Sequence, residues 1–294
     1  MGVENAPRER SGMRITLAQV DARLGDIDAN LELAADVIAE AGKASPDLVV
    51  FPELHLSGYS IGEVDADLSM RPDDPRIEKL SRQVGSSGLL VGFVESGPQG
   101  PHTYNSTAFY QGGRLVHVHR KLYLPAYAPF EERNHFTPGP TLRAFPVEPD
   151  TRMAVLLCND AWQPQLAFLA TQDGARVLLV PAASAQSRFP EHYDSHEYWH
   201  DITHFYGRMF QVFVVFVNRV GTEGPLHFWG GSHVIDPWGN VVAEASQGQQ
   251  QSLTVDIDLA EVRRRRRQVP LVKEARLGLL QREIGRLLEE GGDL

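Results

Sequence analysis

Three side chains with the chemistry of acyl transfer each come directly after a predicted strand. Cys158, the only cysteine, ends an apolar run over residues 153–157, and Glu53 and Lys121 follow two earlier strands. Strand ends open into loops, where functional groups are commonly carried. Taken singly, each has a structural explanation, because a lone cysteine is usually inert core, a loop glutamate is ordinary and most lysines are solvated. Taken together, they are the nucleophile, the base and the cation that a thiol acyl-transfer enzyme requires.

Composition restricts the class of protein. The 294 residues are 42% hydrophobic and 22% charged, with a formal net charge of -10. These values are typical of a soluble globular protein, and the negative charge argues against binding to nucleic acid, whose phosphates would be repelled. The arginine run over residues 263–267 is a local exception. It could bind an anionic partner, form a solvated helix face or pair with acidic groups across an interface.

The chain shows no pattern of export or of a membrane span. One cysteine cannot form an intramolecular disulfide, and no apolar stretch reaches the roughly 20 residues that a span requires. Residues 1–12 are polar and lack the apolar core of a signal peptide, so we expect a disordered lead there. We therefore expect a cytoplasmic protein that does not bind membranes.

Periodicity predicts alternating strands and helices. Strands are expected over residues 13–20, 47–52, 89–94, 106–110, 114–119, 153–157, 177–180, 212–217 and 252–257, with a hairpin over 230–245. Helices are expected over a segment that Asp28 or Asn30 caps and that ends near Gly42, and over residues 73–84, 165–171, 192–211 and 274–290. Alternation predicts an α/β protein, and the hairpins predict mixed rather than purely parallel sheets. Residues 121–140 form a long loop, which is typical of a functional segment.

The blocks around the three reactive residues resemble a known family. Residues 51–54 (Phe-Pro-Glu-Leu), 120–125 (Arg-Lys-Leu-Tyr-Leu-Pro) and 156–160 (Leu-Leu-Cys-Asn-Asp) are similar, in order and spacing, to the signature blocks of the nitrilase superfamily of carbon–nitrogen hydrolases. Residues 136–139, 218–221 and 230–232 support the likeness, which covers residues 13–258. The resemblance implies a four-layer α-β-β-α sandwich with two mixed sheets, commonly dimeric, and an enzyme that needs neither a metal nor another cofactor.

The resemblance also implies a role for each residue. Glu53 would take the proton of the Cys158 thiol, while Lys121 and the backbone N–H of Asn159 would stabilise the oxyanion. A second glutamate follows the lysine in this family, and the sequence favours Glu132, with Glu131 as the fallback. The implied reaction forms a thioester at a C–N bond of a small amide or carbamoyl substrate, releases ammonia or an amine, and ends with hydrolysis by water.

The branch of the family is a narrower question. True nitrilases have Cys-Trp-Glu where this chain has Cys158-Asn159-Asp160, so nitrile hydrolysis is not expected. Cys-Asn-Asp is similar to N-carbamoyl-D-amino-acid amidohydrolases, whereas residues 19–30, 51–59 and 120–132 resemble the glutaminase domain of glutamine-dependent NAD synthetases. Because no ATP-using synthetase domain follows, an amidase-like enzyme acting on linear amides is expected, with a carbamoylase or a stand-alone glutaminase as alternatives. A non-enzymatic scaffold is disfavoured because all three reactive positions are present.

Several further residues are candidates for the pocket or an interface. Aromatic side chains near the reactive residues could line a substrate pocket: Tyr59, Tyr127, Phe130, Trp162 and Trp199. His192, His196, His200 and His204 recur every fourth residue, a spacing that suits metal chelation, a pocket or interface face, or a solvated helix. Tyr206-Gly207 stands where the family commonly has Arg-Ala, which makes local packing there differ. Residues 259–294 form an extension whose amphipathic helix is expected at the dimer interface of a homodimer or higher homo-oligomer.

Overall fold

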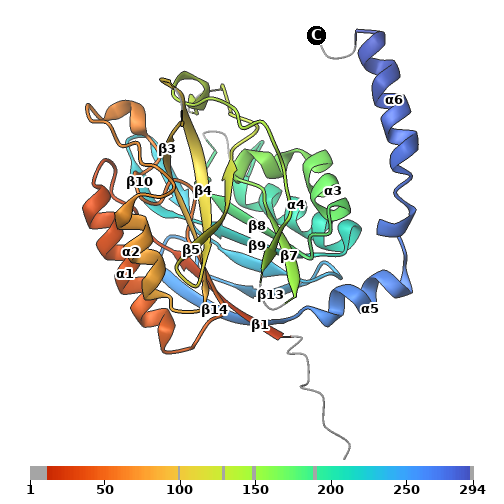
Figure 1. Ribbon diagram of the computed structural model, residues 1–294, viewed down its shortest axis with the longest axis horizontal. Coiled ribbons are helices and arrows are strands. Elements are labelled where there is room, and N and C mark those ends of the chain that lie inside the picture. The colour runs from red at the N-terminus through yellow and green to blue at the C-terminus, as the bar shows by residue number, and fades with distance from the viewer. Residues whose placement is uncertain (1–11, 99, 128–129, 148–149, 188–190, 292–294) are drawn as a thin grey trace, which may run out of the picture.

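Two six-stranded sheets lie face to face in the computed structural model, which describes residues 12–98, 100–127, 130–147, 150–187 and 191–291 (Figure 1). The first sheet has the order β14-β1-β2-β3-β4-β5. Its strands are β1 (Gly12–Gln19), β2 (Leu48–Val50), β3 (Gly88–Ser96), β4 (Thr103–Gln111), β5 (Arg114–Arg120) and β14 (Gln251–Asp258). Parallel pairing of β2 with both β1 and β3, and antiparallel pairing elsewhere, make this sheet mixed.

The second sheet has the order β13-β12-β9-β8-β7-β6 and is also mixed. Its strands are β6 (Phe145–Val147), β7 (Thr151–Val155), β8 (Val177–Ala182), β9 (Phe213–Asn218), β12 (His233–Ile235) and β13 (Val241–Glu244). A separate two-stranded sheet joins β10 (Val220–Glu223) to β11 (Leu226–Trp229). Both predictions, of an α/β class and of mixed sheets, are confirmed.

Helices cover the outer face of each sheet (Figure 1). They are α1 (Ile27–Gly42) and α2 (Pro75–Gln83) on the first sheet, and α3 (Pro164–Gln172) and α4 (Ser195–Phe210) on the second. Strand β8 illustrates why its sequence is apolar throughout. Val177 and Leu179 pack between the two sheets, whereas Leu178 and Val180 pack beneath α3 and α4. Burial on both faces produces the four-layer α-β-β-α sandwich that was expected.

Two helix starts differ from the prediction. Asp26 caps α1 by accepting a bond from the Ala29 N–H, whereas Asn30 is buried and bonds to the backbone of Arg23. Neither Asp28 nor Asn30 is therefore the cap. Helix α4 begins at Ser195, after the cap Asp194, so His192 lies outside it.

The residues after β14 leave the sandwich. The arginine run forms α5 (Ala260–Gln268), where Arg264 pairs with Asp258 and Glu261 and Arg266 donates to the Ala175 carbonyl. Arg264 and Arg266 of the arginine run therefore form their contacts within the same chain. Helix α6 (Leu277–Glu289) has no buried residue and stands apart from the sheets (Figure 1). Short 3-10 turns occupy Ile61–Glu63 and Val272–Glu274.

Two expectations from the sequence concern a disordered lead at the start of the chain and the lack of a membrane span. Of the lead predicted over residues 1–12, residues 1–11 lie outside the described residues, and Gly12 already belongs to β1. Within the described part of the chain, no helix combines the length and the apolar character needed to cross a bilayer.

The Tyr206-Gly207 pair has a packing explanation. The Tyr206 hydroxyl donates to the Ala161 carbonyl, which joins α4 to the turn that carries Cys158. A Cβ at Gly207 would lie 2.5 Å from the Asp236 carbonyl oxygen and 2.7 Å from the Ile235 side chain. Glycine therefore allows α4 to approach the β12–β13 connection closely.

Candidate active site

A buried ammonium lies between two buried carboxylates. Lys121 Nζ donates to Glu53 Oε1 and to Glu132 Oε1, each at 2.6 Å. The side chains of Lys121, Glu53 and Glu132 are 0%, 0% and 4% exposed. Burial alone would lower the pKa of Lys121, but Glu132 and Glu53 together raise it well above its ordinary value. Lys121 therefore stays charged.

Both sheets contribute to holding Glu53. Its Oε1 accepts a bond from Asn105 Nδ2 on β4 at 2.8 Å, and its Oε2 accepts from the Ala183 N–H, just after β8, at 2.9 Å. Lys121 directly follows β5, and its own N–H donates to the Asn105 carbonyl. Asn105 thus contacts the backbone of the lysine and the carboxylate of the glutamate, which sets their relative position.

Cys158 opens the 3-10 turn Cys158–Trp162 with a left-handed φ of +48°. A non-glycine residue in this region carries strain and is common at functional sites. Burial raises the pKa of the Cys158 thiol well above its ordinary value and Glu53 raises it further, while Lys121 lowers it. With two carboxylates and one ammonium beside it, the thiol is protonated at rest and needs a base to become a nucleophile.

Asp160 joins the cysteine turn to the lysine strand. Its Oδ1 accepts bonds from the Leu122 and Tyr123 N–H groups, both at 2.9 Å. Its Oδ2 accepts from the Leu157 N–H at 3.2 Å and lies 2.9 Å from His119 Nε2. The side chain is fully buried, so these bonds fix the distance between the Cys158 and Lys121 backbones.

We expect Asp160→Asn to lower the free energy of unfolding by about 2–3 kcal/mol, because an amide nitrogen would face donors and leave buried N–H groups unpaired. Activity should fall with stability, since the two reactive backbones lose their common anchor. Urea unfolding measures the first effect and steady-state kinetics the second. The matched control is Asp65→Asn at an exposed position, which should change neither. Wild-type stability in Asp160→Asn would contradict the anchoring role.

A cavity of about 400 Å³ opens beside Cys158 and Glu132. All five aromatic candidates lie in its wall, as does Asn159: Tyr59, Tyr127, Phe130, Trp162 and Trp199. The Tyr59 hydroxyl donates to Glu132 Oε1 at 2.6 Å, and the Trp199 N–H donates to Ser184 Oγ at 2.9 Å. The wall combines these aromatic side chains with polar groups such as Glu132 and Ser184, which is typical of a pocket for a small ligand.

Comparison with known proteins places the chain in a family. The family model described as Carbon-nitrogen hydrolase matches residues 14–267. The chain belongs to the carbon–nitrogen hydrolase family. Its sequence is 30% identical over 282 residues to "Omega-amidase NIT3" of Saccharomyces cerevisiae, covering 90% of this chain and 93% of that protein.

Two further relatives bear on the branch of this carbon–nitrogen hydrolase. It is 32% identical over 252 residues to the glutamine-dependent NAD(+) synthetase of Thermotoga maritima, covering 85% of this chain but 42% of that protein. The chain thus spans less than half the length of the synthetases it matches. A solved amidase of the nitrilase superfamily, from Nesterenkonia AN1, aligns with a TM-score of 0.77 at 25% identity, covering 95% of this chain and 99% of that one.

The structure of this carbon–nitrogen hydrolase brings Glu53, Lys121 and Glu132 into direct contact, with Cys158 in the same electrostatic cluster. The second glutamate in contact with Lys121 is Glu132. Glu131 is exposed, and its carboxylate instead accepts a bond from the side chain of Asn134. The neighbouring positions face opposite ways because the 3-10 turn Glu132–Asn134 begins between them.

Sequence reasoning missed several residues that hold the site. Asn105, Asp160 and the Ala183 N–H contact the cluster or its backbone. Glu223 accepts bonds from the Tyr59 and Ser60 N–H groups, which holds the loop after Glu53. The sequence offered little signal for them, because Asn105 stands among the polar residues Thr103, Ser106 and Thr107 of β4, and Asp160 directly follows Asn159.

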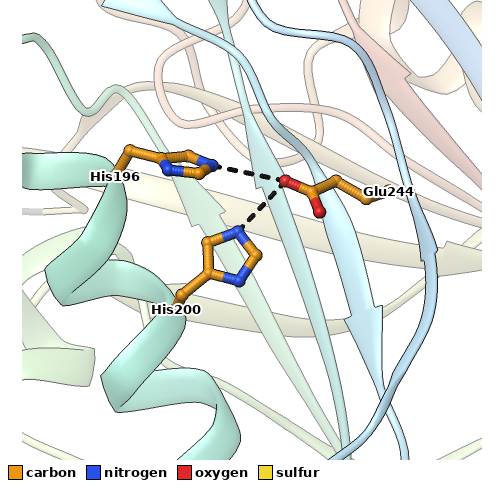
Figure 2. A group of neighbouring side chains, drawn as sticks. All are labelled: His196, His200 and Glu244. Carbon is orange, nitrogen blue, oxygen red and sulfur yellow. Dashed lines mark hydrogen bonds and ion pairs between the residues drawn. The ribbon is translucent and has the colours of Figure 1, made fainter.

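The histidine row divides into separate environments. His196 and His200 both contact Glu244 (Figure 2). His204 instead lies against the Gly239 carbonyl. His192 precedes the helix and is exposed. The described wall of the cavity beside Cys158 contains none of the four.

Proposed function

We propose that the protein hydrolyses the C–N bond of a small linear amide through a Cys158 acyl-enzyme. The observation that carries this proposal is the contact of Lys121 with both Glu53 and Glu132 at the cavity that Cys158 borders. Glu53 is the base in this scheme, because the raised pKa of the thiol requires one. Such assisted proton transfer contributes roughly 10²–10⁴-fold to a rate.

In the first half of the reaction, the thiol proton moves to Glu53 and sulfur forms a bond to the carbonyl carbon. The carbonyl electron pair moves to oxygen, where Lys121 and the Asn159 N–H stabilise the charge. An ammonium has three N–H donors, and Glu53 and Glu132 account for two of them, which leaves the third for the oxyanion. When the C–N bond breaks, the proton on Glu53 passes to the leaving nitrogen.

In the second half, water attacks the thioester carbon and gives a proton to Glu53. The C–S bond breaks, the carboxylic acid leaves and the proton returns to sulfur, so the enzyme is regenerated. Glu132 keeps Lys121 charged and in place through both halves. A relative supports the nucleophilic role of the cysteine, because a mutant of the amidase from Nesterenkonia sp. AN1 is described with covalent addition of the acetamide moiety of fluoroacetamide at its active-site cysteine.

The aromatic cavity wall and the full-length match to an omega-amidase favour a carboxamide substrate. The similarity to glutamine-dependent synthetases supports a second candidate, hydrolysis of glutamine. Hydrolysis of N-carbamoyl amino acids is a third candidate, supported only by the Cys-Asn-Asp sequence at residues 158–160.

A panel measurement separates these candidates. Ammonia release is measured with short aliphatic amides, ω-amides of dicarboxylic acids, glutamine and N-carbamoyl amino acids, each with the Cys158→Ala variant as blank. We expect the highest kcat/KM with a simple carboxamide or an ω-amide. Turnover of carbamoyl compounds alone would replace the amidase proposal, and no turnover of any of them by wild-type protein would refute it.

We also propose that the chain forms a homodimer in a reducing compartment such as the cytoplasm, where the Cys158 thiol stays reduced. Exposed apolar side chains run along α6, and others lie on the outer helices. The α6 residues are Leu277, Leu280, Ile284, Leu287 and Leu288. A second copy would bury this stripe, so light scattering should give twice the 32.7 kDa chain mass. A monomeric mass would contradict the proposal.

A further inference from the structure

Two histidines one turn apart on α4 point at one carboxylate oxygen (Figure 2). His196 Nε2 lies 3.3 Å and His200 Nε2 lies 3.0 Å from Glu244 Oε1. The three donor atoms all lie within 4.8 Å of one another. The side chains of His196, His200 and Glu244 are 29%, 19% and 33% exposed, so the group is partly enclosed but open to solvent on one side.

The backbone and the neighbouring rings hold these side chains in position. Trp199 and Thr203 are buried on the same side of α4 as the two histidines, and Glu244 pairs across the sheet with His233 on β12. The His200 ring stacks on the His233 ring with centroids 4.5 Å apart. His196 contacts the Trp229 ring edge-on at 5.0 Å. Packing of this kind orients ligands before an ion arrives.

We propose that His196, His200 and Glu244 form a binding site for a divalent transition-metal ion of the Zn²⁺ type, with water as the fourth ligand. In a tetrahedral site with bonds of about 2.0–2.1 Å, neighbouring ligand atoms lie roughly 3.3 Å apart. The two histidine–glutamate separations already have nearly this length, so only the histidine–histidine separation has to shorten. Two imidazoles and one carboxylate select Zn²⁺, Cu²⁺ or Ni²⁺ over Mg²⁺ and Ca²⁺, which prefer oxygen ligands.

The proposed metal site contains none of the proposed catalytic residues. A metal ion there would act on the position of a helix and not on the reacting atoms. A bound ion would join α4, which carries Trp199 into the wall of the cavity, to the edge strand β13. Its expected role is to fix this helix against the sheet. Without the ion, both histidines can still donate a hydrogen bond to Glu244, so a hydrogen-bonded network alone is the competing outcome.

The test uses the untagged full chain with Cys158→Ala, so that the active-site thiol cannot bind the metal. After removal of metals with a chelator, titration calorimetry with ZnCl₂ should show one equivalent bound per chain, and MgCl₂ should show no binding. Adding Glu244→Gln or His200→Gln should weaken zinc binding at least tenfold. Matched controls are Asp201→Asn, exposed on the same helix, and His192→Gln, exposed before it; both should bind zinc as the parent does.

A stability measurement provides a second readout. At a zinc concentration about 100 times Kd, the Tm of the parent should rise by roughly 5–10 °C, and that of Glu244→Gln should not. If His200→Gln does not fold, Glu244→Gln alone decides the outcome. Absence of zinc binding by the parent, or equal binding by Glu244→Gln, would overturn the proposal and leave the hydrogen-bonded network.

Discussion

Replacing Cys158 with alanine should lower kcat/KM for the best amide by at least about 10⁴-fold, the scale seen when a nucleophile is removed. Tm should hardly change, because alanine keeps the Cβ and leaves the contacts of Asp160 with Leu157 and Tyr123 intact. The left-handed φ of residue 158 is equally strained with either side chain. Ammonia release and thermal unfolding measure the two effects.

Two controls distinguish a nucleophilic role of Cys158 from a role in lining the pocket. Cys158→Ser replaces the thiol with a hydroxyl of similar size. This variant should be nearly as inactive as Cys158→Ala, since an alcohol is a far weaker nucleophile than a thiol at neutral pH. In the wild type, iodoacetamide should add one alkyl group at this sole cysteine, and a substrate amide should slow the addition. Substantial activity in Cys158→Ala would rule out the acyl-enzyme proposal.

Lys121→Met should lower the free energy of unfolding by about 3–5 kcal/mol and abolish hydrolysis. Removing the ammonium leaves the carboxylates of Glu53 and Glu132 buried without a cation, and an uncompensated buried charge is strongly destabilising. The oxyanion also loses a donor. Urea unfolding gives the stability change, and ammonia release gives the activity.

A double variant separates the two effects. Adding Glu132→Gln to Lys121→Met removes one of the two unpaired carboxylates, so part of the lost stability should return while activity stays absent. The matched control is Lys79→Met, exposed on α2, which should change neither property. If the double variant regained activity together with stability, Lys121 would be structural rather than a donor to the reaction.

Local sequence patterns were sufficient to predict most of the helices and strands. Apolar runs such as residues 177–180 and the stripe of α1 predicted their elements correctly, because burial on one or both faces imposes a period that is visible in the sequence. Short elements were missed. Strand β6 has three residues including Pro146, and β10 and β11 have four each, too few for a period to appear.

The sequence by itself determined which groups are available for chemistry and where each leaves its strand: Glu53 after β2, Lys121 after β5 and Cys158 after β7. Only the tertiary structure decided how they are held. Ala183 reaches Glu53 from 130 residues away and from the other sheet, and Glu244 meets the α4 histidines across 44 to 48 residues. Local periodicity carries no record of such contacts, because the packing of one sheet and its helices against the other produces them.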